Sequence, residues 1–366
     1  MTAVDVAIVG GGAVGAACAR AAALRGLEVA IFEPGPDPAA ASPASAGMLA
    51  AQIEPLDDVL IGLSVRGRDL YEPLAPALQE TTGIDIGFWR AGIASVAFDD
   101  QTADRLKEDV ARQRQAGLRC DWLDGGEVRE RWPGAAPECL GALFAPEDGA
   151  VDPQAVARAC LADARRLGAA FQPEKIERLQ IANGRTTGVI SPRGVTAAEH
   201  VVIAAGVWSP QIASLPRPLA VEPLRGQMAA TAWPDGTPPA ILYHEQGYVL
   251  ARGVDAVLGS TMERAGFSAA VTNEGLAQIF RGAVRLLPAL VRQAVARTWA
   301  GLRPVTPDGR PILGRDPELA GLWYATGHGR NGILLAALTG EIIADLLTTG
   351  ETNVDIAPLG ADRFNP

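Results

Sequence analysis

The sequence predicts an α/β protein with a Rossmann-like domain and a second, α+β domain built on an antiparallel sheet. Three observations support this fold class. The 366 residues are too many for one ordinary domain and suit two. Residues 4–32 have the order strand, glycine turn, helix and strand, which indicates a parallel βαβ unit. Between residues 216 and 240, prolines and glycines separate short strand-like runs, which favours antiparallel pairing.

The individual elements follow from local patterns, taken in chain order. Val4–Val9 is a short apolar run, Ala13–Leu24 is alanine-rich and ends before Gly26, and Val29–Phe32 is a second apolar run. A turn rich in proline and glycine then covers residues 34–38. Farther along, we expect helices at 64–80, 101–116, 153–167, 274–286 and 332–347, strand-like patches at 82–98, paired strands on either side of 183–184, and strands at 201–205, 247–251, 256–261 and 322–326.

The composition argues against several classes of function. The net charge is −10 and no run of Lys or Arg occurs, so we expect no nucleic-acid partner. The four cysteines lack CxxC spacing and only three histidines accompany them, so we expect neither disulfides nor a metal site, and a reducing cytoplasm fits best. No apolar stretch reaches about 18 residues without charges or repeated glycines, so we expect no membrane association.

A glycine motif follows the first predicted strand. Gly10-x-Gly12-x-x-Gly15 opens a predicted helix, and Glu33 lies about 20 residues farther on. Gly10 permits a tight turn, Gly12 lets backbone N–H groups approach a pyrophosphate, and Gly15 allows close packing of helix and strand. Glu33 would accept hydrogen bonds from the adenosine ribose. The motif predicts a site for FAD or NAD, and Glu33 disfavours NADP; the alternative is a glycine-rich turn without a ligand.

Two later segments favour FAD. The strand VVIAAGVWS at 201–209 ends in small residues, Ala205 and Gly206, against which a nucleotide can lie flat. The glycine-rich loop 327–336 opens the last helix, whose N-terminus would stabilise the negative charge that a flavin gains on reduction. A nicotinamide gains no such charge. Taken alone, the first segment is compatible with an ordinary strand and turn, and the second with a helix start after a glycine-rich loop.

These motifs carry a resemblance to a known family. The glycine loop, SAGML at 45–49, VVIAAGVWS, WAGLRPVTPDGRPILG at 299–314 and GHGRNGILLAALTGEIIADLL at 327–347 resemble the D-amino-acid-oxidase-like flavoproteins, most of all the glycine oxidases of thiamine biosynthesis. The resemblance runs nearly end to end. It implies a homotetramer and two interleaved domains, an FAD-binding domain at 1–82, 144–218 and 299–366 and a substrate-binding domain at 83–143 and 219–298.

The resemblance also implies which residues line a non-covalent FAD. The monomeric sarcosine oxidases bind their flavin covalently through a cysteine, where this chain has Gly301. Ile176 would supply a backbone contact near the adenine, with Lys175 as the alternative. The expected cofactor-binding set is Gly10, Gly12, Ala13, Val14, Gly15, Glu33, Pro34, Ala41, Ser42, Ser45, Ala46, Gly47, Met48, Ile176, Ala205, Gly206, His328, Gly329, Arg330, Asn331, Gly332, Ile333 and Leu334.

Four residues are expected to bind substrate, again by resemblance: Arg303, Arg330, Tyr248 and Met262. Arg303 also has an independent physical case, because a guanidinium binds a carboxylate through two parallel hydrogen bonds. The alternatives are a surface ion pair for Arg303, a sheet-packing aromatic for Tyr248 and ordinary core for Met262. His328 is interpreted as a flavin-loop residue and not as a base, because the resemblance implies hydride transfer from the substrate Cα to flavin N5.

We therefore expect an FAD-dependent oxidase of glycine or a small N-substituted glycine, whose products are a 2-oxo acid, ammonia or an amine, and hydrogen peroxide. Gln246 and Gly247 stand where glycine oxidases carry bulkier residues, so the entrance is expected to be wider and a bulkier N-alkyl glycine or D-amino acid is an alternative. The rival classes are a dehydrogenase that passes electrons to quinone at a membrane, and a non-catalytic flavin-binding subunit.

Overall fold

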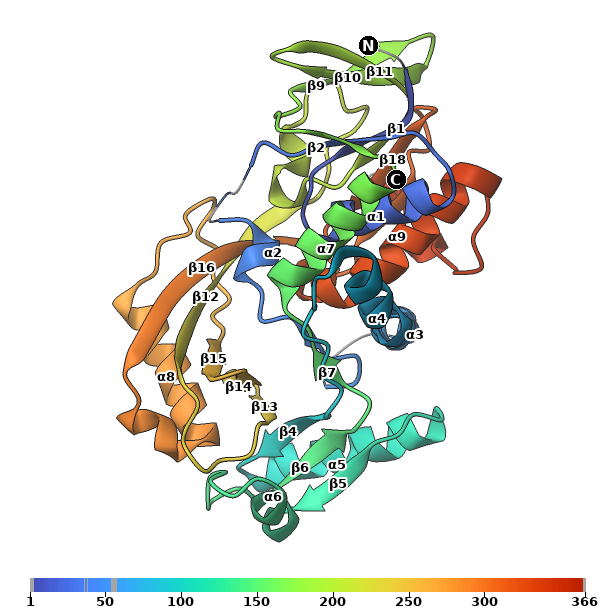
Figure 1. The fold of residues 1–366 in the computed structure, drawn as a ribbon. Coiled ribbons are helices and arrows are strands. Elements are labelled where there is room, and N and C mark those ends of the chain that lie inside the picture. The colour runs from blue at the N-terminus through green and yellow to red at the C-terminus, as the bar shows by residue number, and fades with distance from the viewer. Residues whose placement is uncertain (1–2, 36, 38, 54–57, 365–366) are drawn as a thin grey trace.

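The computed structural model describes residues 3–35, 37, 39–53 and 58–364, which form two large sheets (Figure 1). In the first sheet, parallel strands run side by side in the order β18, β11, β1, β2 and β8. The bounds of these parallel strands are β1 Val4–Val9, β2 Val29–Phe32, β8 Ala170–Gln172, β11 Gly194–Ile203 and β18 Leu322–Thr326. At one edge, β17 Ile312–Arg315 pairs antiparallel with β18. The hairpin of β9 Arg178–Ala182 and β10 Arg185–Ser191 pairs with β11 through β10.

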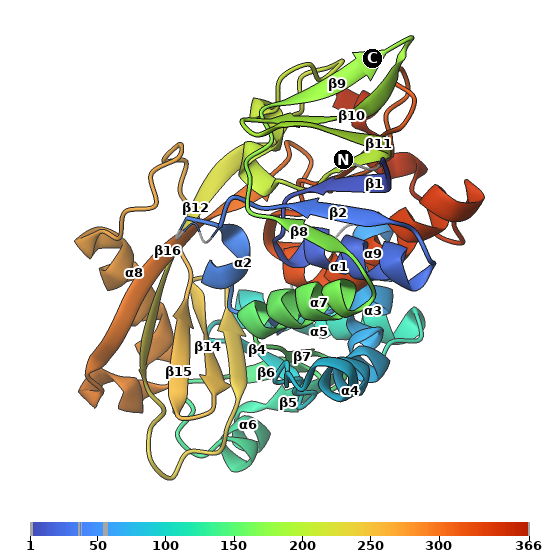
Figure 2. The same cartoon turned by 45° about the horizontal axis from the view of Figure 1, so that its top comes forward.

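Helices cover one face of this sheet and the β9–β10 hairpin lies over the other (Figure 2). The helices are α1 Ala13–Leu24, α3 Asp58–Asp69, α4 Tyr71–Thr82, α7 Pro153–Arg166 and α9 Gly332–Thr349. The small side chains of α1 let α9 approach closely: a Cβ at Gly340 would lie 2.7 Å from the carbonyl oxygen of Ala17. Residues Gly329–Thr349 are long and apolar enough to span a membrane by length and composition alone, but α9 packs on α1 as a core helix.

The second sheet is mostly antiparallel, in the order β16, β12, β15, β14, β13, β4, β6 and β5. Its strands are β4 Ile93–Ala97, β5 Asp121–Asp124, β6 Gly141–Ala145, β12 Glu222–Ala232, β13 Ile241–His244, β14 Gly247–Arg252, β15 Asp255–Gly259 and β16 Val295–Val305. Helices α6 Gly125–Arg131 and α8 Asn273–Leu286 pack on one face. Helix α5 Asp100–Gln115 packs on the other, which also carries the side chains of Met228 and Tyr248.

A short segment that follows β2 reaches the second sheet. Helix α2 Ala41–Ala44 lies beside β16 (Figure 1). The backbone N–H of Leu302 donates to the carbonyl of Ala39 at 2.9 Å, and the indole N–H of Trp299 donates to the carbonyl of Ala44 at 3.0 Å. After α2, the two-residue strand β3 Met48–Leu49 pairs with β7 Gly149–Ala150. Residues 39–50 therefore connect the two sheets.

The predicted fold class is confirmed, and several elements differ in detail. The helix expected at 64–80 is two helices, α3 and α4, because Pro73 could not continue α3 without a clash against the turn before it. The short strands expected at 216–240 are one long strand, β12. The expected domain boundary at 299 falls inside β16 and the one at 144 inside β6, so both strands extend across the limits drawn from the sequence.

Candidate active site

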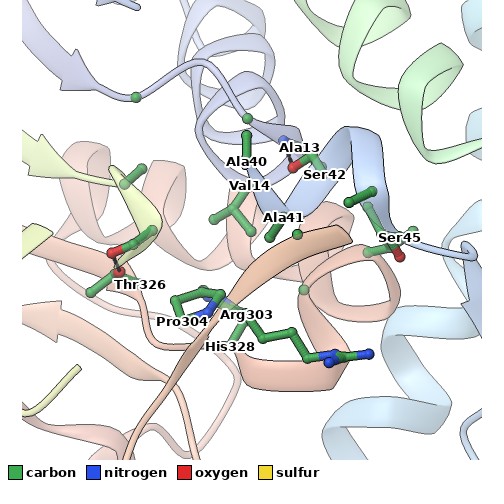
Figure 3. A pocket seen from close by; sticks show the side chains of 18 of the residues that line it. Ala13, Val14, Ala40, Ala41, Ser42, Ser45, Arg303, Pro304, Thr326 and His328 are labelled. Carbon is green, nitrogen blue, oxygen red and sulfur yellow. Dashed lines mark hydrogen bonds between the residues drawn. The ribbon is translucent and has the colours of Figure 1, made fainter. Parts of the chain in front are cut away.

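A cavity extends from the end of β1 to β16, between the two sheets (Figure 3). It is lined by every residue of the expected cofactor-binding set except Gly15, which packs behind the loop. Of the four expected substrate residues, Arg303, Arg330 and Tyr248 line the cavity. Met262 does not, and its side chain is 55% exposed, so the structure gives no support to its expected place beside the substrate.

The glycine loop is shaped by contacts that no side chain could occupy. Gly10 has φ of +110°, and a Cβ there would lie 2.4 Å from the carbonyl oxygen of Ala204 on the neighbouring strand. A Cβ at Gly15 would lie 2.0 Å from the carbonyl oxygen of Gly10. These positions require glycine for the turn and for close packing of α1 on β1. The cavity thus begins at a backbone surface without side chains.

Glu33 directly follows β2 and lines this part of the cavity. Its Oε2 accepts the backbone N–H of Gly11 at 2.7 Å. Burial raises the pKa of its carboxyl group, and the hydrogen bonds from the backbone N–H groups of Gly11 and Gly35 oppose that shift. The carboxylate is therefore held against the glycine loop, at the edge of the space where the ribose of a dinucleotide would lie.

Two helices point their N-termini into the cavity. Neither α1 nor α9 has an acidic residue in its first turn or a side-chain cap from its N-cap residue, Gly12 and Asn331 respectively. The N–H of Ala13 donates to the Ser42 hydroxyl at 3.0 Å (Figure 3). The positive ends of the two helix dipoles thus meet the cavity without a carboxylate of their own, an arrangement that fits the pyrophosphate and the reduced ring of FAD.

The segment 45–48 contacts both Arg252 of β14 and the residue that follows β7, Val151. Gly47 has φ of +73°, and a Cβ there would lie 2.1 Å from the carbonyl oxygen of Val151. The guanidinium of Arg252, on β14, donates to the carbonyls of Val151, at 3.1 Å, and Ala46. Burial lowers the pKa of Arg252. A cation on the second sheet thus fixes a cavity-lining segment that lies outside that sheet.

The far end of the cavity carries the expected substrate residues. Figure 3 shows the Arg303 side chain pointing away from Ala13 and Ser42. Its Nη2 donates to the Ser260 hydroxyl at 2.7 Å, and its Nη1 donates to the carbonyl of Thr261 at 3.2 Å. These bonds orient the guanidinium of a residue that lines the cavity.

Two tyrosines of adjacent strands accompany Arg303. The Tyr248 hydroxyl donates to the Met228 sulfur at 3.2 Å. Arg330, in the turn before α9, donates from Nη2 to the Tyr243 hydroxyl at 3.3 Å. Gln246 and Gly247 lie outside the cavity lining, and a Cβ at Gly247 would lie 2.8 Å from the carbonyl oxygen of Gly259. Their small size therefore does not widen the cavity itself.

His328 is buried, and its Nε2 lies 3.0 Å from the Thr339 hydroxyl. Burial lowers the pKa of His328 to about 4, so the imidazole is neutral at physiological pH. A neutral ring hydrogen-bonded to a core threonine suits a loop-anchoring role. His328 lines the cavity beside Gly329, and its place in a flavin loop stays a prediction.

Some lining residues were not singled out in the sequence. Gly226, Met228 and Ser260 surround the guanidinium of Arg303 and the hydroxyl of Tyr248. Gly226 and Met228 occupy alternate positions of β12 and so share a face, which is the only sequence signal that could have found them. A single methionine or glycine in a strand is otherwise indistinguishable from ordinary core.

Gly301 has no room for a side chain: a Cβ would lie 2.3 Å from the Cβ of Ala44. The four cysteines, Cys18, Cys120, Cys139 and Cys160, are free and buried, and none lines the cavity. Among the described residues, no group of three or more His, Cys, Asp or Glu side chains could hold a metal ion.

Known proteins resemble this chain along its length. Residues 5–346 match the family model DAO, described as FAD dependent oxidoreductase. The chain is 38% identical over 365 residues to a glycine oxidase of Geobacillus kaustophilus (strain HTA426), with 98% of this chain and 97% of that protein covered. It is 34% identical over 367 residues to the "Bifunctional protein ThiO/ThiG" of Trichormus variabilis (strain ATCC 29413 / PCC 7937), covering 98% of this chain and 55% of that protein.

The fold of this chain also resembles that of a solved structure. The crystal structure of glycine oxidase from Geobacillus kaustophilus superposes with a TM-score of 0.94 at 34% sequence identity, and the match covers 99% of both chains.

Proposed function

Since the chain belongs to the DAO family of FAD-dependent oxidoreductases, we propose that it oxidises glycine or a small N-substituted glycine. The products are a 2-oxo acid, ammonia or an amine, and hydrogen peroxide. For glycine the reaction consumes one oxygen and one water molecule and gives glyoxylate, ammonia and peroxide. The similarity to the ThiO/ThiG protein supports a place in thiamine biosynthesis.

One observation carries this proposal: a single cavity joins the glycine loop after β1 to the guanidinium of Arg303. The glycine loop and the N-termini of α1 and α9 suit an anionic dinucleotide. The guanidinium at the other end suits a small carboxylate. A non-catalytic flavin-binding subunit would need the first feature only, so the second argues for an enzyme.

The chain's own residues bind and orient the substrate. Arg303 binds the substrate carboxylate, and the Tyr248 hydroxyl, at the same end of the cavity, turns its O–H from the Met228 sulfur to donate to that carboxylate. Arg330 adds a second positive charge to the cavity wall. When bound, FAD would supply the redox chemistry, namely hydride acceptance from the substrate Cα and electron transfer to oxygen.

No side chain need act as a base at the substrate Cα. His328 lines the cavity on the loop that precedes α9. Its ring is neutral and shares a hydrogen bond with the Thr339 hydroxyl. Its task is to hold that loop, with Gly329 and Asn331, in the shape that receives the flavin ring.

The test is an oxidase assay of the purified holoprotein with glycine, sarcosine, N-ethylglycine and D-alanine. We expect peroxide and oxygen consumption in equal amounts with glycine or sarcosine as the best substrate. A preference for N-ethylglycine or D-alanine would favour the bulkier alternative. Turnover with an artificial electron acceptor but none with oxygen would contradict the oxidase assignment and favour the dehydrogenase.

Four further features belong to the proposed function. The FAD is non-covalent, because Gly301 and the buried cysteines leave no thiol at the cavity. The four free thiols support a cytoplasmic location. A homotetramer follows from the family resemblance, and size-exclusion chromatography with light scattering measures it. The first sheet corresponds to the FAD-binding domain and the second to the substrate-binding domain.

A further inference from the structure

The Arg303 side chain lies flat across a neighbouring strand. Arg303 is on β16, which pairs with β12 such that Gly226 lies opposite Gly301. A Cβ at Gly226 would lie 2.0 Å from the Arg303 Nη1. The guanidinium therefore occupies the space that a side chain at Gly226 would fill. It crosses β12 at the glycine of that strand, where no side chain is in the way.

Beyond β12 the guanidinium meets the segment 260–263. This segment follows β15 and runs beside β12, where Arg225 and Glu263 exchange backbone hydrogen bonds of 2.9 and 3.0 Å. It offers Arg303 two acceptors, the Ser260 hydroxyl at 2.7 Å and the Thr261 carbonyl at 3.2 Å. The two bonds use different nitrogens, so together they fix both the position and the plane of the guanidinium.

A buried network fixes the segment itself. The backbone N–H of Gln227 donates to the Thr261 hydroxyl at 2.9 Å, and both side chains are fully buried. The Gln227 amide donates to Glu263 Oε1 at 2.7 Å and to the Thr272 hydroxyl at 3.1 Å, and its oxygen accepts the Thr272 N–H at 2.7 Å. Gln227 does not line the cavity, so this network acts on the segment from behind.

We propose that Ser260 is a positioning residue for substrate binding: its hydroxyl holds the Arg303 guanidinium in the plane that a substrate carboxylate requires. The proposal rests on the proposed function, since it assumes that Arg303 binds a carboxylate. A bidentate guanidinium–carboxylate pair needs coplanar groups, and a guanidinium free to rotate must lose that freedom on binding. Because Ser260 already restricts the rotation of the guanidinium, less conformational entropy is lost when the substrate binds. The Thr261 carbonyl is the second acceptor, and Gly226 leaves space for the guanidinium.

The test compares Ser260→Ala, Ser260→Thr and wild-type holoprotein. Ser268→Ala is the matched control, because Ser268 is an exposed serine of the same connection between β15 and α8. Binding is measured by titrating glycolate, a carboxylate as short as glycine that carries no amine, and following the flavin absorbance. KM and kcat for glycine are measured in parallel, with FAD content and Tm as structural readouts.

We expect Ser260→Ala to raise the Kd for glycolate and the KM for glycine about tenfold, and to lower kcat by a smaller factor. FAD content and Tm should match wild type. Ser260→Thr keeps the hydroxyl and should restore both constants to within about threefold of wild type, and Ser268→Ala should equal wild type.

An unchanged Kd in Ser260→Ala would overturn the proposal, and so would lost FAD or a lower Tm in that variant, because the role would then be structural. Wild type that binds glycolate but forms no peroxide from any glycine derivative would refute the proposed function alone. Wild type that oxidises glycine but does not bind glycolate would overturn the positioning proposal alone, and wild type that does neither would overturn both.

Discussion

Two side chains at the candidate substrate end owe their positions to glycines on neighbouring strands. Arg303 crosses β12 over Gly226, and Tyr248 crosses β15 over Gly259, where a Cβ would lie 2.4 Å from the Tyr248 hydroxyl. Beyond Gly259 the hydroxyl reaches the Met228 sulfur. The glycines thus let the Arg303 guanidinium and the Tyr248 hydroxyl lie against the sheet in defined positions. Such fixed polar groups suit the binding of a substrate with few atoms.

Gly301 is a third such position, and its substitution gives a direct prediction. Gly301→Ala would place a Cβ 2.3 Å from the Cβ of Ala44, in α2 beside the cavity. We expect a loss of about 1–3 kcal/mol in the free energy of unfolding and weaker retention of FAD. Chemical denaturation and the flavin-to-protein absorbance ratio measure both. Thr298→Ala, at an exposed site on the same strand, should change neither, and a Gly301→Ala protein as stable as wild type would refute the close contact.

His328 makes a prediction about pH. Its folded-state pKa is lowered from 6.5 to about 4, so the unfolded chain takes up a proton between these values and the folded chain does not. The contribution of His328 to stability is complete above pH 6.5 and is lost as the pH falls toward 4. At about pH 5 the loss is roughly 2 kcal/mol.

The measurement is the free energy of unfolding at pH 7 and pH 5 for wild type and His328→Asn. We expect a smaller decrease between the two pH values in the variant, whatever its absolute stability. An equal decrease in both proteins would mean that His328 is protonated in the folded state, contrary to its burial beside Thr339.

At the scale of elements, α1 and α9 form the centre of the first domain, and both begin at the cavity. Their contact depends on small residues, since Gly340 of α9 faces the backbone of α1 at Ala17. The interface that stabilises the domain therefore also sets the positions of the two helix N-termini at the candidate FAD site.

Gly340→Val tests this coupling. A Cβ at Gly340 would lie 2.7 Å from the Ala17 carbonyl oxygen, and the branched side chain would force the helices apart. We expect a loss of at least about 2 kcal/mol in the free energy of unfolding and a higher Kd for FAD. Gly62→Ala, in α3 with no atom within 4 Å of the added Cβ, is the control and should be neutral or slightly stabilising. Normal FAD affinity in a destabilised Gly340→Val protein would contradict the coupling.

The sequence predicted the elements that have a clear hydrophobic periodicity and are bounded by turn residues. The βαβ unit at 4–32, the helices at 101–116 and 153–167 and the hairpin of β14 and β15 lie within a residue or two of their predicted bounds. The strands β5 and β6 were not predicted, because half-buried and uniformly buried strands lack a clear alternation. Helices α3 and α4 were merged because the helical period continues through Leu70, and the prolines that argue against one long helix, Pro73 and Pro76, lie inside α4.

At the scale of the whole molecule, the cavity exists because distant segments meet between two sheets. Residues 39–50, which follow β2 of the first sheet, contact β16 of the second, and Arg252 of the second sheet donates to the carbonyls of Ala46 and Val151. The expected cofactor residues other than Gly15 line this cavity together, as the family motifs implied. Their individual roles remain predictions.

The parts of the site that the sequence did not reveal depend on register. Ser260 meets Arg303 only because β15 ends beside β12 and the chain then turns along it, and no local pattern encodes that contact. Met262, two residues farther on, was expected at the substrate and is largely exposed. A shift of one residue along an extended segment moves a side chain to the other face, and sequence patterns alone do not resolve the register here.

The central claim is that this cavity brings a carboxylate-bearing amine to FAD through Arg303. The most direct measurement mixes the holoprotein anaerobically with glycine or sarcosine and follows the flavin absorbance. We predict complete bleaching of the oxidised flavin in wild type, and in Arg303→Ala, with FAD still bound, bleaching that requires at least about 100-fold more amine. Equal amine dependence in the two proteins, or no bleaching of wild-type flavin by either amine, would contradict the claim.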